Sequence, residues 1–539
     1  MSRILYYNGI IHPLQGRKTI QALGVEGGRI RAIGSEEDLA AWRTADTRLI
    51  NLEGRTMLPA FIDAHSHLTA LANTLQCVSL QDAGSFTEIQ KRLQEYIAGR
   101  KLSDGEWIIG VGYDHNSLEE QRHPTRRMLD AIAQNHPIVI SHVSGHMGVA
   151  NSAALARAGI DEASEDPAGG VIGREEDGRT PNGYLEEKAF LALVAHTPQI
   201  TPERQRELIQ EAQRVYSRYG ITTVQDGLTG EAEMTWLDQA AKQGDLFLDV
   251  VAYTDLKNAP SLQRQYPAYR QRYHRGLKLG GYKIILDGSP QGRTAWMTSP
   301  YEPGPDQPAD YCGYPIYSDR EVRGFIERAL REHTQLLVHC NGDAAAEQMI
   351  RCMQAGLRTV GDRPETRPVM IHAQLVRKDQ LERMRDCGIL PSFFVAHTYY
   401  WGDVHRRNFG AARADRISPV GTAARLGMPY TFHQDTPVLP PDMLKTVWCA
   451  VNRKTREGTA LDPTERVSVG EALYGVTAGG AFSYFEEAEK GTLEIGKRAD
   501  LVILDRDPFA VDPAALDQIR VEATIKDGKI IYERAAEGG

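Results

Sequence analysis

The sequence has few cysteines, and their spacing argues against a cysteine-based framework. Only six occur in 539 residues, and no two form a C-x-x-C pair. Disulfide frameworks are typical of short secreted domains, and structural zinc sites commonly use closely spaced cysteine pairs. We therefore expect reduced, mostly buried thiols. The six are Cys77, Cys312, Cys340, Cys352, Cys387 and Cys449.

Several other features are also missing. No run of about 18 apolar residues occurs, so we predict no membrane span. The first residues, MSRILYYNGI, contain no long apolar segment followed by a cleavage site, so we predict no signal peptide and a cytoplasmic location. The net charge of −9 argues against nucleic acid as a main partner, which requires a basic surface. A glycine-rich phosphate loop is absent, so a nucleotide-driven enzyme is not supported.

What the sequence does contain is typical of a globular protein. Hydrophobic residues make up 41% of the chain and charged residues 25%. The length suggests about two to four domains, although single barrel domains are also long. We expect a small-molecule substrate and no membrane partner. If the chain forms an oligomer, we expect a homodimer.

The middle of the chain alternates strand and helix signals. Eight apolar runs have the length of buried strands, and amphipathic stretches such as 319–333 separate most of them. Eight strands alternating with helices predict a (β/α)8 TIM-type barrel of the α/β class. The predicted strands are 58–64, 220–227, 246–253, 280–289, 335–343, 368–376, 389–397 and 429–437.

Two further regions complete the predicted architecture. Residues 1–57 and 490–539 both read as short strands with Asn-Gly, Gly-Gly and Asp-Gly turns, and neither is long enough to form a stable core alone. We therefore predict one composite β-sandwich domain built from both termini, with the barrel in 58–489. Residues 68–215 are too long for one helix, so we predict an insertion that covers the active site as a lid.

Candidate metal ligands follow the predicted strands. His65 and His67 end the stretch LPAFIDAHSH, and side chains two apart in a strand point the same way, so both can approach one ion. An isolated His-x-His pair is as often an ordinary pair of histidines. Here further polar residues lie within or after other strands, and all parallel strands share one C-terminal edge. These residues are Lys283, His339, His372 and Asp435.

The set of motifs resembles the amidohydrolase superfamily, and within it amidohydrolase family 3, the YtcJ-like or N-substituted formamide deformylase-like enzymes. The resemblance covers nearly the whole chain and is carried by FIDAHSH, YKIILDGSPQGRTA, VHCNGD, IHAQ and HQDTP. Two positions depart from the family pattern, Ile371 before the histidine of IHAQ and the His433-Gln434 pair before Asp435.

The resemblance implies a binuclear site with divalent ions, which we expect to be two zinc ions per chain. His65 and His67 would hold one ion, and His339 and His372 the second. Lys283 would be carboxylated, because a buried neutral amine can add carbon dioxide and the carbamate can bridge two ions. Without that modification, Lys283 would be a structural lysine paired with Asp287.

The expected reaction is hydrolysis of a carbon–nitrogen amide-type bond other than a peptide bond in a folded protein. A divalent ion lowers the pKa of bound water to about 7 and polarises a carbonyl, so the ion activates a hydroxide. Asp435 would bind metal weakly, take the proton of the water and pass it to the leaving nitrogen. Ester or lactone hydrolysis or decarboxylation at the same site stays open, because fold and ligands do not separate these reactions. A non-catalytic scaffold is disfavoured by the complete ligand set.

Four further residues are predicted to contact substrate, each with a plain structural alternative. Asp114 in GYDHNSL and His146 in SGHMGVANSAAL match the family's insertion, but local loop hydrogen bonding explains them equally well. Arg293 would hold a substrate anion or brace a loop. His397 begins the run HTYYW after the seventh strand, which either packs an apolar substituent or forms loop core.

Overall fold

A computed structural model describes residues 3–16, 19–100, 102–115, 117–143, 146–197, 200–303, 308–361 and 364–535. The chain divides into two compact units, one of residues 1–69 with 212–539 and one of residues 70–211. Within the described residues, no helix has both the length and the apolar character needed to cross a bilayer. All six cysteines are free thiols, of which Cys340, Cys352 and Cys449 are buried.

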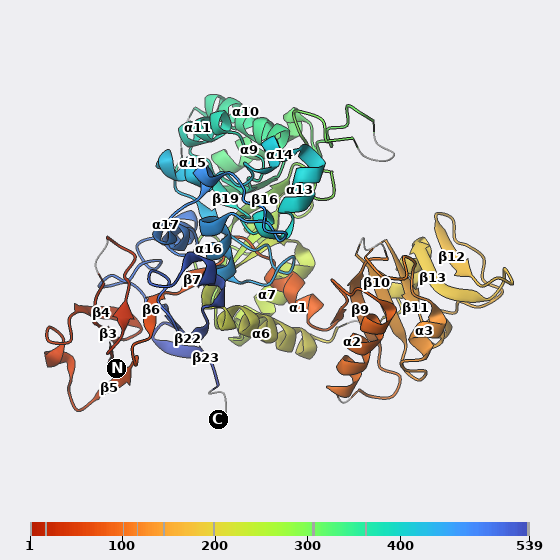
Figure 1. Ribbon diagram of the computed structural model, residues 1–539, viewed down its shortest axis with the longest axis horizontal. Helices are drawn as coiled ribbons and strands as arrows, with labels where there is room; N and C mark the ends of the chain where they lie inside the picture. The colour runs from red at the N-terminus through yellow and green to blue at the C-terminus, as the bar shows by residue number, and fades with distance from the viewer. Residues whose placement is uncertain are drawn as a thin grey trace. The chain divides into compact units, whose positions relative to one another are not determined.

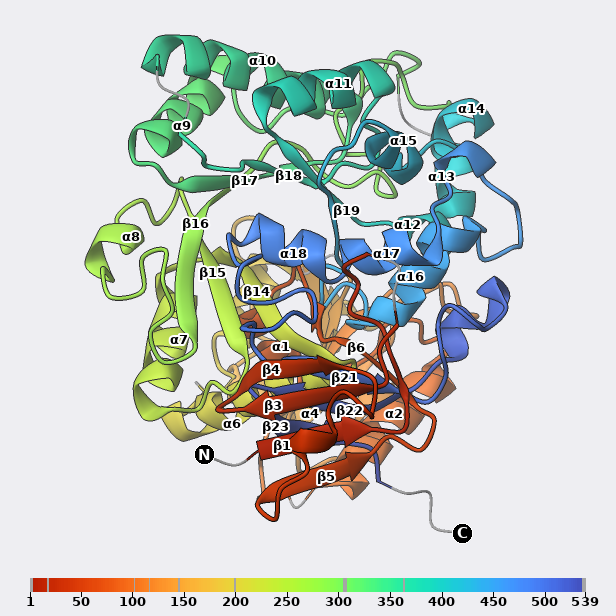
Figure 2. The ribbon, with the colours of Figure 1, turned by 90° about the vertical axis from the view of Figure 1, so that its left-hand side faces the viewer.

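The larger unit contains an eight-stranded parallel sheet whose strands follow one another in chain order (Figure 2). Every neighbouring pair is parallel, so the predicted order of eight parallel strands is confirmed. The strands are β7 (Phe61–Ile62), β14 (Ile221–Thr229), β15 (Asp249–Asp255), β16 (Leu277–Ile285), β17 (Gln335–Cys340), β18 (Val369–His372), β19 (Leu390–Phe393) and β20 (Thr431–Phe432).

The two ends of this curled sheet meet just beyond the end strands. The backbone amide of Asp435 donates to the carbonyl of His65 at 3.2 Å, and the amide of His67 donates to the carbonyl of Thr436 at 2.8 Å. Residues that are 370 positions apart in the sequence are therefore hydrogen-bonded neighbours at the C-terminal edge of the sheet.

Helices separate the strands, as expected for this fold class. The capping box at Ser318 and Glu321 starts α9, which ends at Arg331 rather than at the predicted residue 333. Both α9 and α10 pack beside β17 (Figure 2). The helices are α7 (Glu231–Gln243), α8 (Leu262–Gln265), α9 (Asp319–Arg331), α10 (Asp343–Val360), α11 (Lys378–Cys387), α12 (His397–Tyr400), α13 (Gly402–Phe409), α14 (Ala411–Ala414), α15 (Val420–Arg425), α16 (Met443–Asn452), α17 (Val469–Gly475) and α18 (Ala478–Ser483).

The predicted strand 58–64 is divided between two sheets. Its first part belongs to β6 (Thr56–Pro59), which pairs with β21 (Leu501–Leu504), and only Phe61 and Ile62 join the parallel sheet as β7. The change occurs at Ala60, whose amide donates to the carbonyl of Asp500 at 2.9 Å. The prediction of one continuous strand was wrong because an apolar run does not reveal a change of hydrogen-bonding partner.

Strands from both termini lie side by side (Figure 2). One sheet has the order β2-β6-β21-β22-β23 and a second has the order β4-β3-β1-β5. Apolar residues of both sheets share one buried cluster that includes Leu23, Met57, Leu501 and Ile525. The further strands are β1 (Arg3–Tyr7), β2 (Ile10–Ile11), β3 (Ala22–Glu26), β4 (Arg29–Gly34), β5 (Thr47–Asn51), β22 (Val521–Lys526) and β23 (Lys529–Glu533).

The Asp-Gly turn predicted near the C-terminus is present. Strands β22 and β23 pair in antiparallel fashion around Asp527 and Gly528, which have φ values of 49° and 73°. Two consecutive positive φ angles are the requirement of a type I′ hairpin turn. The 3-10 turns are η1 (Ala40–Trp42), η2 (Pro463–Glu465) and η3 (Pro513–Gln518).

The smaller unit, within the predicted insertion, has its own six-stranded sheet of order β12-β13-β11-β10-β9-β8 (Figure 1). Strands β8, β9 and β10 are parallel and the other pairs antiparallel. Two apolar clusters stabilise it, one around Ile108 and Ile140 and one around Val139 and Leu185. The prediction that this unit covers the active site as a lid stays a prediction.

The elements of the smaller unit, with the two helices that connect it to the larger unit, are α1 (Leu68–Thr74), β8 (Val78–Ser79), α2 (Phe86–Ala98), β9 (Ile108–Tyr113), α3 (Arg126–Asp130), β10 (Ile138–His142), β11 (Met147–Ala150), α4 (Ser152–Arg157), β12 (Gly170–Arg174), β13 (Pro181–Glu187), α5 (Lys188–Val194) and α6 (Pro202–Arg218).

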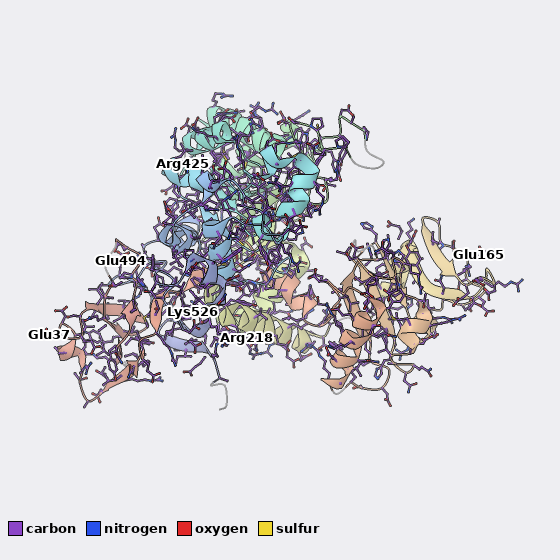
Figure 3. All side chains as sticks on the ribbon, viewed as in Figure 1. Glu37, Glu165, Arg218, Arg425, Glu494 and Lys526 are labelled. Atoms are coloured by element: carbon purple, nitrogen blue, oxygen red, sulfur yellow. The ribbon has the colours of Figure 1, made fainter. Side chains whose placement is uncertain are left out.

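A buried ion network joins the parallel sheet to the terminal strands. Asp249, the first residue of β15, forms ion pairs with Lys490, with Lys526 at 3.0 Å and with Arg498 at 2.6 Å (Lys526 is labelled in Figure 3). Burial opposes ionisation of Asp249, but these cations hold its pKa below the usual range. One carboxylate thus contacts cations from two segments, the loop before β21 and strand β22, and Glu486, Asp527 and Asp500 pair with the same cations.

Asp249→Asn should destabilise the larger unit by about 3–5 kcal/mol, because it removes the carboxylate that Lys490, Lys526 and Arg498 share. Because the pKa of Asp249 is lowered in the folded state, its contribution is present above about pH 4 and is lost as the pH falls further. Urea unfolding at pH 7 and at lower pH measures both effects. Arg351→Met, which removes an exposed pair with Asp319, is the control and should cost about 0–1 kcal/mol. An equally small effect of Asp249→Asn would contradict this account.

Candidate metal centre

Five side chains that the sequence predicts as ligands converge at the C-terminal edge of the parallel sheet. Asp435 Oδ1 lies 3.3 Å from Nε2 of both His65 and His67. Its second oxygen, Oδ2, lies 4.0 Å from Nε2 of His372. Lys283 Nζ lies 3.3 Å from Nε2 of His65. Donor atoms of His65, His372 and Asp435 therefore all lie within 4.8 Å of one another.

Burial decides the charge states in this cluster. Burial holds the pKa of His65 and His372 well below the usual range, so both imidazoles are neutral and offer a lone pair. Burial also lowers the pKa of Lys283 to about 7, against the opposing effect of Asp435. For Asp435 burial favours the protonated acid, but contacts with the histidines, foremost His67, hold its pKa well below the usual range.

The residues present fit a divalent cation. Asp435 Oδ1 is a buried acceptor that makes no aligned hydrogen bond with any described residue, although two imidazole nitrogens face it at 3.3 Å. Such an orphaned carboxylate oxygen is costly without a cation or donor. Neutral imidazoles with a carboxylate are the ligand types that zinc and similar ions take. His65, His67 and Asp435 would hold one ion, and His372 faces the second oxygen of the same carboxylate.

Gln225 orients His65. Its Oε1 lies 2.5 Å from His65 Nδ1, and its Nε2 donates to the carbonyl of Ala64 at 2.7 Å and to the hydroxyl of Tyr484 at 3.0 Å. The amide oxygen thus accepts the Nδ1 proton and leaves Nε2 of His65 available as a ligand. Gly227 leaves room for the ring, because a Cβ there would lie 2.6 Å from His65 Cε1.

His372 is held in a similar way. His433 Nε2 lies 3.1 Å from His372 Nδ1, and His433 Nδ1 lies 2.9 Å from Ser392 Oγ. With Nδ1 engaged, His372 presents Nε2 toward Asp435. His372 and Asp435 have φ values of 72° and 55°, in the left-handed region that residues with a Cβ rarely adopt. Such backbone strain is typical of functional sites.

The sequence did not predict these supporting roles. Gln225 appears in ITTVQDG as a polar residue on a buried strand, and His433 appears only as a departure from the family pattern. A polar residue on an otherwise apolar strand signals a buried hydrogen bond, but the partner is known only once the strands are paired.

The predicted alternative partner of Lys283 has other contacts. The carboxylate of Asp287 accepts hydrogen bonds from the backbone amides of Asn341 at 3.0 Å, Gly342 at 2.7 Å and Trp296 at 3.0 Å. Asp287 therefore fixes the loops that follow β16 and β17, while Lys283 faces His65.

His339 lies beside the cluster with its nitrogens turned elsewhere. Its ring centroid is 4.6 Å from that of His372. Its Nδ1 lies 3.2 Å from Asp287 Oδ1, and its Nε2 lies 3.2 Å from Asn341 Nδ2. The arrangement presents one well-defined donor set, around Asp435, and a second ion ligated by His339 stays a prediction.

Arg293 and His397 make local contacts in the larger unit. Arg293 donates to the carbonyl of Glu302 at 2.5 Å, and its guanidinium lies 5.1 Å from the ring centre of Tyr301. His397 is buried, and its Nδ1 lies 3.1 Å from His405 Nε2. Burial lowers the pKa of His397 well below the usual range. Their predicted contacts with substrate stay predictions.

Asp114 and His146 lie in the smaller unit. The side chain of His146 is 67% exposed, with Nδ1 3.2 Å from Glu187 Oε2. Asp114 instead lies against His142, at 3.5 Å. Their predicted roles in substrate binding also stay predictions.

Comparison with known proteins finds relatives that match nearly the whole chain. An N-substituted formamide deformylase from Arthrobacter pascens is 28% identical over an alignment of 560 residues, gaps included, that covers 99% of each chain. The putative amidohydrolase YtcJ from Bacillus subtilis (strain 168) is 27% identical over 99% of this chain and 100% of its own. An uncharacterized metal-dependent hydrolase from Pyrococcus furiosus has a crystal structure that superposes with a TM-score of 0.74 at 28% identity, covering 94% of this chain and 100% of that one.

These similarities support a hydrolase that depends on a divalent metal. The family match spans residues 48–532, which include all six predicted ligands. The chain belongs to the Amidohydrolase family.

Proposed function

We propose that this chain hydrolyses a carbon–nitrogen amide-type bond in a small molecule such as an N-substituted amide or formamide. The observation that carries the proposal is the ionised Asp435 carboxylate, whose unpartnered Oδ1 faces the Nε2 atoms of His65 and His67 at 3.3 Å. The choice of a carbon–nitrogen bond is supported by the similarity to the N-substituted formamide deformylase.

Each of these residues has a defined role in the proposed hydrolysis. A bound divalent ion lowers the pKa of water and polarises a carbonyl oxygen. His65 and His67 would hold one ion through their ring nitrogens, and Gln225 fixes the tautomer of His65 as His433 fixes that of His372. Asp435 orients the attacking water and accepts its proton. It then returns that proton to the leaving nitrogen, so the amine departs neutral and the carboxylate is regenerated.

Lys283 would complete the site as a carbamate. Burial favours its neutral amine, which is the form that adds carbon dioxide, and its Nζ lies 3.3 Å from a ligand nitrogen of His65. The carbamate would add a negative charge between two cations, of which His339 and His372 would bind the second. We propose zinc for both ions, because imidazole and carboxylate ligands suit it.

Asp435→Asn should reduce kcat by about 10²–10⁴-fold, because it removes the group that moves the proton. Much of the metal should remain, since the amide keeps one oxygen. Steady-state kinetics on a panel of N-acyl amines and matched esters measures the loss and also separates amide from ester hydrolysis. Asp255→Asn is the control, because that carboxylate caps the Lys257–Asn258 turn, and it should keep near-normal kcat. Near-normal turnover of Asp435→Asn would require another base.

Lys283→Ala should lower the metal content from about two ions per chain toward one and remove most activity. Acetate or propionate should partly restore both, because a small carboxylate can occupy the place of the carbamate. Elemental analysis and activity with and without these acids provide the measurement. Full metal content and normal turnover in the variant would exclude a bridging carbamate.

Gln225→Leu should weaken metal binding by about 10–100-fold, as is typical when the outer partner of a ligating histidine is lost. The control is Gln335→Leu, which removes an equally buried glutamine that donates to the carbonyls of Arg367 and Ser483. Both variants should lose stability, but only Gln225→Leu should release metal more easily to a chelator. Equal metal affinity in the two variants would show that Gln225 does not orient His65.

A further inference from the structure

The smaller unit holds a second cluster of ligand-type side chains. Asp114 and His115 follow β9, and His142 is the last residue of β10. The two strands are parallel neighbours, so their C-terminal ends lie together. The amide of Val143 donates to the carbonyl of Tyr113 at 2.8 Å and fixes the two ends against each other.

The three side chains direct donor atoms toward one point. His115 Nδ1 lies 3.2 Å from His142 Nε2. Asp114 Oδ1 lies 3.5 Å from His142 Nε2 and 3.9 Å from His115 Nδ1. Donors held at zinc-to-ligand distances in a tetrahedron are about 3.3–3.5 Å apart. The triangle therefore has nearly the size of one face of a tetrahedral site, and small side-chain rotations would complete it.

The exposure of the three side chains suits a cation site. The side chain of His142 is 8% exposed, whereas those of Asp114 and His115 are 35% and 29% exposed. One ligand is thus anchored in the sheet, and the other two leave a path for ion entry.

An aromatic frame holds the two imidazoles. The ring of His123 stacks on His115 with centroids 4.1 Å apart and an interplanar angle of 30°, and His123 Nδ1 lies 2.9 Å from the Tyr113 hydroxyl. Tyr184 covers His123 at 4.4 Å, and Tyr113 meets His142 edge-on at 5.4 Å. Ligands with fixed orientation bind metal more tightly.

We propose that Asp114, His115 and His142 bind one divalent transition-metal ion of the zinc class, in a site separate from the barrel cluster. Two imidazoles and one carboxylate favour zinc or a similar ion, whereas calcium and magnesium require mainly oxygen ligands. Three protein ligands leave at least one coordination position for water or another small donor. Asp114 is then a metal ligand, a different role from the substrate contact that the sequence predicted.

The experiment uses the full chain carrying His65→Ala, His67→Ala, His339→Ala and His372→Ala, so that ions at the barrel cluster do not mask the second site. After chelator treatment, zinc is titrated by calorimetry and counted by elemental analysis of the desalted protein. This protein should bind one zinc ion per chain, and adding His142→Ala should abolish the binding. Absence of zinc binding before that change, or its survival afterwards, would overturn the proposal and leave a hydrogen-bonded histidine pair.

Two further variants keep the test decisive. Asp114→Asn changes a part-exposed side chain with little effect on packing, so it should weaken zinc binding even where His142→Ala fails to fold. His136→Ala is the matched control in the same unit, because that ring instead lies 3.0 Å from the carbonyl of Glu106. It should leave zinc binding unchanged, and a loss equal to that in Asp114→Asn would also overturn the proposal. Because the barrel ligands are already removed, the outcome is independent of the proposed hydrolase function.

Discussion

The meeting of the first and last strands of the parallel sheet is the constraint on which the metal centre depends. The backbone hydrogen bonds that link His65 to Asp435 and His67 to Thr436 bring the two ends of the sheet together. The same contacts place the Asp435 carboxylate against two imidazoles. A shift of one residue in this pairing would turn alternate side chains to the other face and separate the ligands. The left-handed backbone at His372 and Asp435 is therefore tolerated because the surrounding sheet fixes it.

Desolvation links this geometry to chemistry. Burial keeps His65 and His372 neutral and brings the pKa of Lys283 to about 7, whereas the contacts of Asp435 keep it ionised. A buried carboxylate oxygen that has no hydrogen-bond donor and lies beside a neutral imidazole is energetically unfavourable. A bound cation would stabilise this arrangement. The fold thus holds a set of ligands in which the buried negative charge of Asp435 would be compensated by a bound cation.

The sequence predicted the strand order and five of the converging side chains because both follow from periodicity and from the shared edge of parallel strands. It did not predict that the apolar run at 58–64 is divided between two sheets at Ala60, since hydrogen-bond partners leave no trace in hydrophobicity. It likewise missed Gln225 and His433, whose roles come from His65 and His372, with atoms 2.5 Å and 3.1 Å away on other elements. Such contacts depend on register and rotamer, which local pattern does not determine.

The two donor clusters obey the same rule in different settings. Each lies where neighbouring parallel strands end, because that edge brings residues distant in sequence together while their strands remain paired. They differ in how their ligands are supported. In the barrel, His65 and His372 each hydrogen-bond a further buried side chain, whereas in the smaller unit stacked rings orient the imidazoles. They also differ in solvent access, since the side chain of Asp435 is 15% exposed and that of Asp114 is 35% exposed. A more exposed carboxylate stays better hydrated and gains less from an ion, so the cluster of the smaller unit should bind metal more weakly and exchange it faster.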